Sequence, residues 1–157
     1  MPDKKTAIHD LELGYQEFRT PLDRLEDGDF AEVWLGSWNL SQLLAHMAGW
    51  YREMTPAFAR VAAGDRPTPP GVDYSDADAW NAKFEKLARS GKSALKDFDD
   101  AYQAYLAAAK SLPEEFYGTD PEKGRPRIGN RLLQASGIGH FEEHQGQLDA
   151  WLKTKDD

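Results

Sequence analysis

Residues 40–50 read LSQLLAHMAGW, and the apolar positions of this stretch set a pattern that continues to residue 61. Apolar residues recur at spacings of three and four, which is the period of one face of an α-helix. Asn39 precedes the stripe and is a favourable N-cap residue, while Gly64 is typical of a helix end. The sequence therefore predicts a helix that begins at Asn39 and ends at Gly64. Its apolar stripe is Leu40, Leu43, Leu44, Met47, Trp50, Tyr51, Met54, Phe58 and Val61.

Three further segments of the chain show the same helical period. The first covers residues 3–25, where Pro21 favours a kink or an early end of the helix. The third begins at residue 75 or 76 and has a break at residues 90–93, and the last covers residues 127–153. No segment shows the convincing period-two alternation that would indicate a strand. The pattern favours an all-α protein.

The connection between the second and third helical segments is long and rich in proline. Between Gly64 and Tyr74 it contains Pro67, Pro69 and Pro70, a density that neither a helix nor a central strand tolerates. Four amphipathic segments in a chain of this length are most simply a four-helix bundle, formed by a single domain over residues 1–157. The long crossover between helices 2 and 3 predicts a topology other than a plain up-down-up-down bundle.

The composition excludes several classes of function. The net charge is −8, and an acidic surface repels both phosphate backbones and anionic membranes, so we expect no nucleic-acid partner and no membrane binding. The chain has no cysteine, which removes disulfides, thiolate metal sites and thiol catalysis by the protein itself. Neither a signal-peptide core nor an apolar run of ~20 residues is present, so we expect a soluble, cytoplasmic protein.

Three of the four histidines fall on helix faces that should point into the bundle. His140 and His144 are four residues apart, about one helical turn, so both rings leave the same face. Leu148 continues that face. His46 has the same setting in the second helix, with Trp50 one turn after it. Imidazoles from two helices are therefore predicted to meet in one core.

A metal ion would solve the problem that buried imidazoles create. Each ring must satisfy two nitrogens, and three neutral rings around one divalent cation do so together, as in other bundle cores. Spacing alone does not require a metal, because a pair four apart is also common at exposed or cap-bonded positions and His46 alone suits a core histidine. His9 has no partner at metal spacing and is predicted to be a surface or cap residue.

Two stretches resemble motifs of the DinB/YfiT-like proteins. Residues 40–50 are similar to the second-helix motif, a capped start and a leucine pair followed by a histidine and an aromatic residue. Residues 140–148, HFEEHQGQL, resemble the last-helix motif, two histidines followed by Gly-Gln-aliphatic. Residues 79–81 and 112–115 are similar to the ClbS/DfsB-type branch. The resemblance implies a four-helix bundle of DinB/YfiT type in which three histidines bind a divalent metal, nickel or zinc: His46, His140 and His144.

The resemblance leaves the activity open between three alternatives. One is a metal-dependent enzyme acting on a small molecule, either a thiol S-transferase that uses a low-molecular-weight thiol such as mycothiol or bacillithiol, or a hydrolase. The second is a non-catalytic protein that sequesters a small molecule in the same cavity, as in ClbS/DfsB-like protection. In the third, the metal only stiffens the bundle. Relatives often form homodimers, so the resemblance also implies a homodimer.

Two polar residues beside the last two histidines are candidates for a catalytic or supporting role. Gln147 lies three after His144 and seven after His140, so it is predicted to orient a metal-bound water or to donate to a ligand's second nitrogen. A core glutamine bonded to backbone accounts for it equally well. Glu143 is a candidate general base, although it and Glu142 lie off the ligand face and a solvated carboxylate accounts for both.

Overall fold

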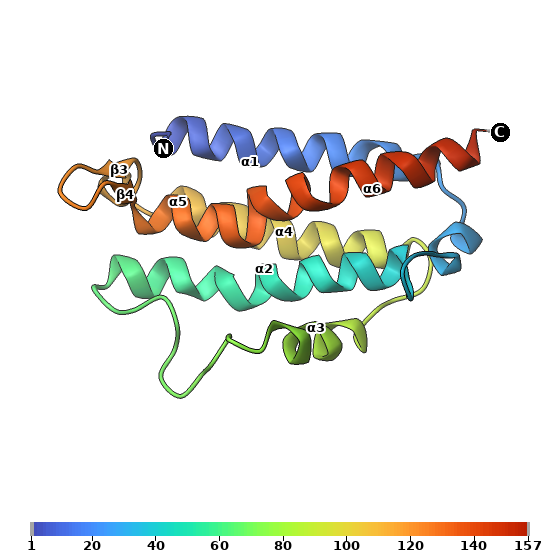
Figure 1. The fold of residues 1–157 in the computed structure, drawn as a ribbon, viewed down its shortest axis with the longest axis horizontal. Coiled ribbons are helices and arrows are strands. Elements are labelled where there is room, and N and C mark those ends of the chain that lie inside the picture. Colours follow the sequence, from blue (N-terminus) through green and yellow to red (C-terminus); the bar gives the residue numbers. More distant parts are fainter. Residues whose placement is uncertain (1, 157) are drawn as a thin grey trace.

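The long helices of the chain lie side by side along one axis in the computed structural model, which describes residues 2–156 (Figure 1). The fourth side of the bundle consists of a short helix and a long helix joined by a π-helical turn at Gln134–Ile138. The predicted all-α four-helix bundle is therefore confirmed. Its helices are α1 (Lys4–Arg19), α2 (Leu40–Ala62), α4 (Ser93–Ser111), α5 (Ile128–Leu133) and α6 (Gly139–Lys155).

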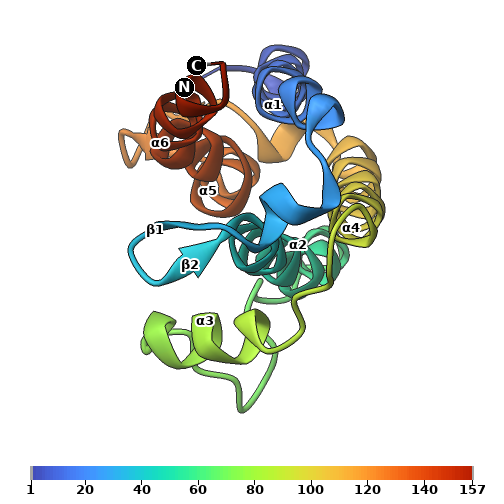
Figure 2. The same ribbon diagram turned by 90° about the vertical axis from the view of Figure 1, so that its right-hand side faces the viewer.

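The crossover after α2 decides the topology. It carries the chain back along the outside of the bundle and includes α3 (Ala77–Glu85), which lies against α2 and away from the other helices (Figure 1 and Figure 2). Consequently α2 and α4 run in the same direction. The predicted long crossover and the departure from an up-down-up-down arrangement are both confirmed. The predicted break at residues 90–93 is also present, because α4 begins at Ser93.

Both ends of α2 follow from the residues at its boundaries. The Asn39 side chain accepts from the backbone N–H of Gln42, and the Gln42 side chain accepts from the N–H of Asn39, which is a capping box. Gly64 follows the helix with a φ of +87°, a backbone conformation that residues with a Cβ rarely adopt. The sequence therefore placed this helix correctly.

The first helical segment ends earlier than its apolar stripe. Helix α1 begins after Asp3, whose side chain accepts from Thr6, and it ends at Arg19. Pro21 then occupies the first turn of a 3₁₀ helix, Thr20–Arg24, and a second 3₁₀ helix follows at Asp27–Ala31. The early end predicted at Pro21 is confirmed.

Two small β-hairpins depart from the expectation that the chain has no strand. Strand β1 (Val33–Leu35) pairs with β2 (Trp38–Asn39), and β3 (Thr119–Asp120) pairs with β4 (Arg125–Pro126). Strands this short cannot display an alternating pattern, which is why the sequence did not reveal them. The first hairpin places tryptophans over one end of the bundle, where the Trp34 ring stacks on Trp151 with centroids 4.7 Å apart.

Glycines in the last helical segment allow close contacts. A Cβ at Gly137 would lie 2.7 Å from Leu11 of α1, and one at Gly139 would lie 2.2 Å from the Gln134 carbonyl oxygen in the π-helical turn. Gly146 has open space around it, so at that position the cost to helix stability has no packing reason. Close packing therefore accounts for two of the three glycines.

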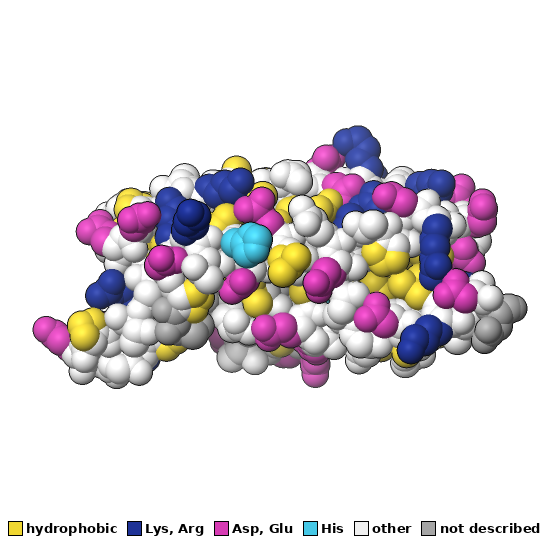
Figure 3. Space-filling view, turned by 90° about the horizontal axis from the view of Figure 1, so that it is seen from above, with side chains coloured by type: hydrophobic (Ala, Val, Ile, Leu, Met, Phe, Trp, Pro, Cys, Tyr) yellow, Lys and Arg dark blue, Asp and Glu magenta, His cyan; other side chains and the backbone are white. Residues whose placement is uncertain are grey.

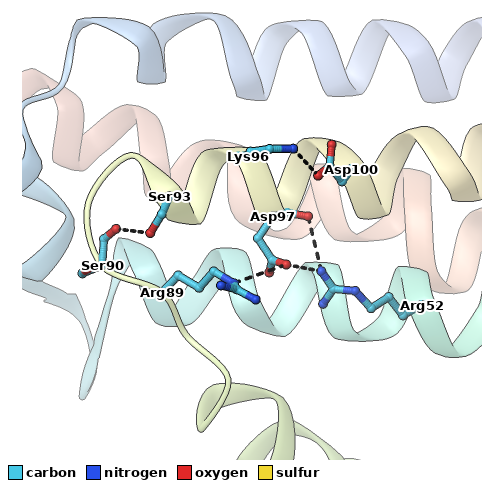
Figure 4. A network of polar contacts seen from close by, with 7 residues as sticks. All are labelled: Arg52, Arg89, Ser90, Ser93, Lys96, Asp97 and Asp100. Carbon is cyan, nitrogen blue, oxygen red and sulfur yellow. Dashed lines mark hydrogen bonds and ion pairs between the residues drawn. The ribbon is translucent and has the colours of Figure 1, made fainter.

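Ion pairs join the bundle on its outer surface. Asp97 of α4 lies between Arg52 of α2 and Arg89 of the α3–α4 connection and pairs with both (Figure 4). On the face shown in Figure 3, acidic and basic side chains are interspersed. No helix within residues 2–156 is long and apolar enough to cross a membrane.

Candidate metal centre

Three histidines meet inside the bundle. His46 comes from α2, and His140 and His144 come from α6. The exposed fractions of these residues are 6%, 9% and 5%. The ring centroid of His46 lies 5.0 Å from that of His140 and 5.8 Å from that of His144, and the two α6 rings are 6.0 Å apart. The predicted convergence of imidazoles from two helices is therefore present.

The Nδ1 atom of His46 is held by a residue of α3. It lies 2.9 Å from Oδ1 of Asn81, and the indole Nε1–H of Trp50 donates to the same oxygen over 2.8 Å. The ring is also covered by Trp38 of the first hairpin, with centroids 5.1 Å apart. Residues of the first hairpin, of α2 itself and of the sequence-distant α3 thus surround one imidazole.

The Nδ1 atom of His140 is held by the π-helical turn that precedes α6. It lies 2.9 Å from the backbone carbonyl oxygen of Ser136. A carbonyl oxygen only accepts, so Nδ1 carries the proton and Nε2 has the lone pair. The π-helical turn interrupts the regular hydrogen-bond pattern of the helix at this point, and π-helical turns are frequent at functional sites.

His144 has the least satisfied ring of the three. Its Nδ1 lies 2.8 Å from Oε1 of Gln147, whereas its Nε2 is buried and has no hydrogen-bond partner in residues 2–156. The nearest charged group is the Glu143 carboxylate, with Oε2 3.9 Å from Nε2. A buried nitrogen without a partner costs free energy unless something occupies the space beside it.

Burial keeps two of the rings neutral. Desolvation, followed by the proximity of His140 and His144, lowers the pKa of His46 to about 3. Desolvation and the neighbouring His144 also lower the pKa of His140. Neutral rings are the form in which imidazole binds metals, because the coordinating nitrogen must offer a lone pair.

The donor set fits a divalent cation in kind. Each ring has its Nδ1 on an oxygen acceptor, which is how metal-ligating histidines are oriented, and each leaves Nε2 for coordination. Two ligands at ~2.1 Å from one ion place their ring centres about 5 Å apart, so the His46–His140 spacing suits a shared ion. The ring centre of His144 lies about 1 Å farther from the other two ring centres than a shared ion requires. Among the described residues, no group of three His, Cys, Asp or Glu side chains already has the spacing of a metal site.

The other polar residues singled out in the sequence differ in exposure and in their hydrogen-bond partners. Gln147 bonds the second nitrogen of His144, as one alternative predicted, but as an acceptor and from an exposed position. Glu143 has a 65% exposed side chain whose carboxylate reaches His144. Glu142 accepts a hydrogen bond from Gln134 instead. His9 is exposed on α1, in agreement with the prediction.

Asn81 is the functional candidate that sequence reasoning missed. It belongs to the Ala79–Asn81 stretch that resembles the ClbS/DfsB-type branch, but nothing in its spacing indicates a contact with His46. The contact exists because α3 folds back on α2, which depends on the path of the crossover. Ser136 was missed for a similar reason, since its carbonyl oxygen acts through the π-helical turn.

A polar cavity of about 820 Å³ lies at the start of α2. Asn39, Gln42 and Glu85 line it together with Arg89 and Lys92 of the α3–α4 connection. None of the three histidines is among its lining residues. The cavity and the histidine cluster are therefore separate features, although Gln42 is only one turn before His46.

Residues 11–127 match the sequence family described as the mycothiol maleylpyruvate isomerase N-terminal domain. This chain belongs to that family. The match includes α2 and His46 but ends before His140 and His144. No curated protein matches the chain at a significant level of sequence similarity.

Solved structures share this fold over most of the chain. The colibactin self-resistance protein ClbS, in complex with a dsDNA, has 14% identity and a TM-score of 0.77, covering 94% of each chain. The sibling lethal factor precursor DfsB has 15% identity and a TM-score of 0.78, covering 99% of this chain and 98% of its own. At these identities the two matches show a shared fold, which is the fold that the resemblance to the ClbS/DfsB-type branch implied.

An enzyme is also among the similar structures. The mycothiol-dependent maleylpyruvate isomerase has 17% identity and a TM-score of 0.70; the match covers 94% of this chain but only 61% of the isomerase chain. At these identities the likeness concerns the fold alone. The expectation that the chain avoids nucleic acid gains no support, because ClbS was solved with dsDNA, and it remains a prediction.

Proposed function

We propose that the chain binds a divalent metal ion, nickel or zinc, through Nε2 of His46, His140 and His144 and acts as a metal-dependent enzyme on a small molecule. The observation that carries the proposal is the buried, unpartnered Nε2 of His144, in a ring whose centroid lies 5.8 and 6.0 Å from those of two further imidazoles. The Nδ1 atoms of these two rings both lie against oxygen acceptors. A shared cation satisfies all three nitrogens without charging any ring.

The reaction type depends on the coordination positions that three protein ligands would leave open on the metal ion. A bound nickel or zinc ion would supply a Lewis acid with open positions, at which the pKa of a water or a thiol falls. The chain has no cysteine, so a thiol S-transferase reaction requires a low-molecular-weight thiol, such as the mycothiol named in the family description. A hydrolase of the same class requires only water.

Two side chains beside the cluster have supporting roles in this proposal. The Glu143 carboxylate is exposed to solvent and lies 3.9 Å from Nε2 of His144. It could therefore take a proton from a water or thiol bound at the cluster and release it to bulk water. Oε1 of Gln147 accepts a hydrogen bond from Nδ1–H of His144 and thereby leaves the other nitrogen of that ring for the cluster.

Elemental analysis of the purified protein tests the metal site. We expect about one equivalent of metal in the wild-type protein and loss of most of it in His46→Ala and in His144→Ala, because two imidazoles hold an ion far more weakly than three. His9→Ala removes a histidine outside the cluster and should retain the metal. Wild-type protein without stoichiometric metal, after exposure to zinc and nickel at neutral pH, would overturn the proposal.

A second candidate function is non-catalytic sequestration of a small molecule. It is favoured by Glu143, the carboxylate beside the cluster, because a 65% exposed side chain is poorly held for acid–base catalysis. ClbS, which matches over 94% of its length, is described as a self-resistance protein. Incubating the metal-loaded protein with a thiol and an excess of an activated aryl halide separates the two functions. Repeated formation of the thioether product indicates a transferase. Removal of one equivalent of the halide from free solution, without any thioether product, indicates sequestration.

A further inference from the structure

Helix α3 docks on α2 through a ladder of polar contacts. The Gln42 side chain donates to Glu85 over 3.0 Å, and one turn further along α2, Nδ1 of His46 meets Oδ1 of Asn81. Along α3 the order is reversed, because Asn81 precedes Glu85 by one turn. The ladder therefore fixes the antiparallel register of the two helices, and one of its rungs is a proposed metal ligand.

A glycine lets the two helices approach closely. A Cβ at Gly49 would lie 2.2 Å from the ring of Phe84, so only a glycine at this position leaves room for that ring. Phe84 is the buried residue of α3, and Trp50 packs against its edge with centroids 5.2 Å apart. The docking of α3 thus depends on one buried aromatic ring and the polar ladder.

Trp50 determines which atom Asn81 presents to His46. An indole N–H can only donate, so the Asn81 atom that receives it over 2.8 Å is the oxygen. Because that same oxygen faces Nδ1 of His46, Nδ1 carries the proton and donates. Nε2 of His46 is then left with its lone pair directed away from α3. A side chain on the outer helix therefore sets the tautomer of a ring in the bundle core.

We propose that Asn81 is a positioning residue of the metal centre, which orients His46 and raises the affinity of the site through the docking of α3. This inference rests on the proposed function, since it assigns a partner to one of the metal ligands. A hydrogen-bond acceptor on the distal ring nitrogen fixes the ring and increases the basicity of the ligating nitrogen. Reciprocity then requires that a bound ion strengthens the docking of α3 by the same factor.

The first test measures the zinc affinity of matched variants by competition with a chromophoric chelator. Asn81→Leu keeps the size of the side chain but removes the acceptor, and we expect the affinity to fall about 10- to 100-fold. Asn81→Asp restores an acceptor and should return the affinity to within about threefold of wild type or better.

One control variant separates orientation of His46 from general damage to α3. Glu85→Leu removes the neighbouring rung without touching the Asn81–His46 contact and should stay within about threefold of the wild-type affinity. Trp50→Phe removes the indole donor that orients the Asn81 amide, so it should lower the affinity, but by less than Asn81→Leu does. Circular dichroism of each variant confirms that it remains helical, and Asn81→Ala serves as a second acceptor-free variant.

The second test follows hydrogen exchange of residues 77–85 with and without zinc. Zinc should slow exchange in this segment of the wild-type protein and have no such effect in Asn81→Leu. A wild type that binds zinc together with an Asn81→Leu variant of unchanged affinity overturns the positioning role and leaves the proposed function intact. A wild type that binds neither zinc nor nickel overturns the proposed function, and the positioning role falls with it.

Discussion

At the scale of single residues, two neighbouring imidazoles add to the burial that opposes protonation of His46. His46 is surrounded by apolar and aromatic side chains, and two further imidazoles lie against its ring. The same burial that lowers its pKa makes it a ready ligand at neutral pH. The burial of His46 therefore explains both its suitability as a metal ligand and the loss of stability that we expect in acid.

The pH dependence of stability follows from the lowered pKa of His46. In the unfolded chain this ring has a pKa near 6.5, and in the folded protein about 3, so between these values the unfolded state binds more protons. Stability is therefore full above about pH 6.5 and falls as the pH drops toward 3. His140 acts in the same direction.

Urea unfolding of the chelator-treated protein from about pH 7 to about pH 4 measures this effect. We expect the midpoint to fall steadily with acid, and the fall to be smaller in His46→Ala, which lacks the ring. His9→Ala, altered at an exposed position of α1, should retain the wild-type slope. Equal slopes in the wild type and His46→Ala would show that this ring does not contribute.

At the scale of elements, the sequence predicted the helices and the long crossover but not the docking of α3 on α2. The Asn39 cap, the Gly64 end and the stop at Pro21 are local effects of residues within one turn, so they could be predicted. The hairpins were missed because two or three residues carry no period. Asn81 was missed because its role depends on α3 folding back across α2, and no local pattern encodes that path.

Gly49→Ala should loosen the contact between α2 and α3. The added methyl group would overlap the Phe84 ring, and overpacking of this kind costs about 1–3 kcal/mol. Gly146→Ala is a suitable comparison, because a Cβ there meets open space and alanine favours a helix by up to ~1 kcal/mol. Denaturant unfolding should show opposite changes in the two variants; a stabilised Gly49→Ala would contradict the close packing.

At the scale of the whole molecule, the apolar core does not depend on the histidine cluster. Aromatic rings from α1, α2 and α4 stack through the bundle, with Tyr15 and Tyr102 centroids 3.8 Å apart and Tyr51 and Tyr105 centroids 5.0 Å apart. The convergence of three histidines could be predicted because each lies on an apolar helix face. Their final spacing could not, since it depends on a π-helical turn that leaves no sequence period.

Removal of metal should therefore leave the bundle folded but less stable. Ligand at about 100 times its dissociation constant adds about 2.7 kcal/mol, which corresponds to a rise of roughly 5–10 °C in Tm for a domain of this size. We expect the far-UV circular dichroism of the chelated protein to stay helical at about 25 °C. Loss of helical signal on chelation would favour the alternative in which the metal has a structural role.

The π-helical turn at Gln134–Ile138 has a consequence for how this cluster arises and is lost. Such a turn accommodates one more residue than a regular α-helix, and each residue of an α-helix turns the chain by about 100°. Deleting a single amino acid from the turn would let it close into a regular α-helix and leave the downstream face nearly unchanged. The regular helix between His140 and His144 has no such spare residue. A one-codon deletion there would rotate His144 by about 100° relative to His140 and abolish the cluster while every histidine stays in the gene.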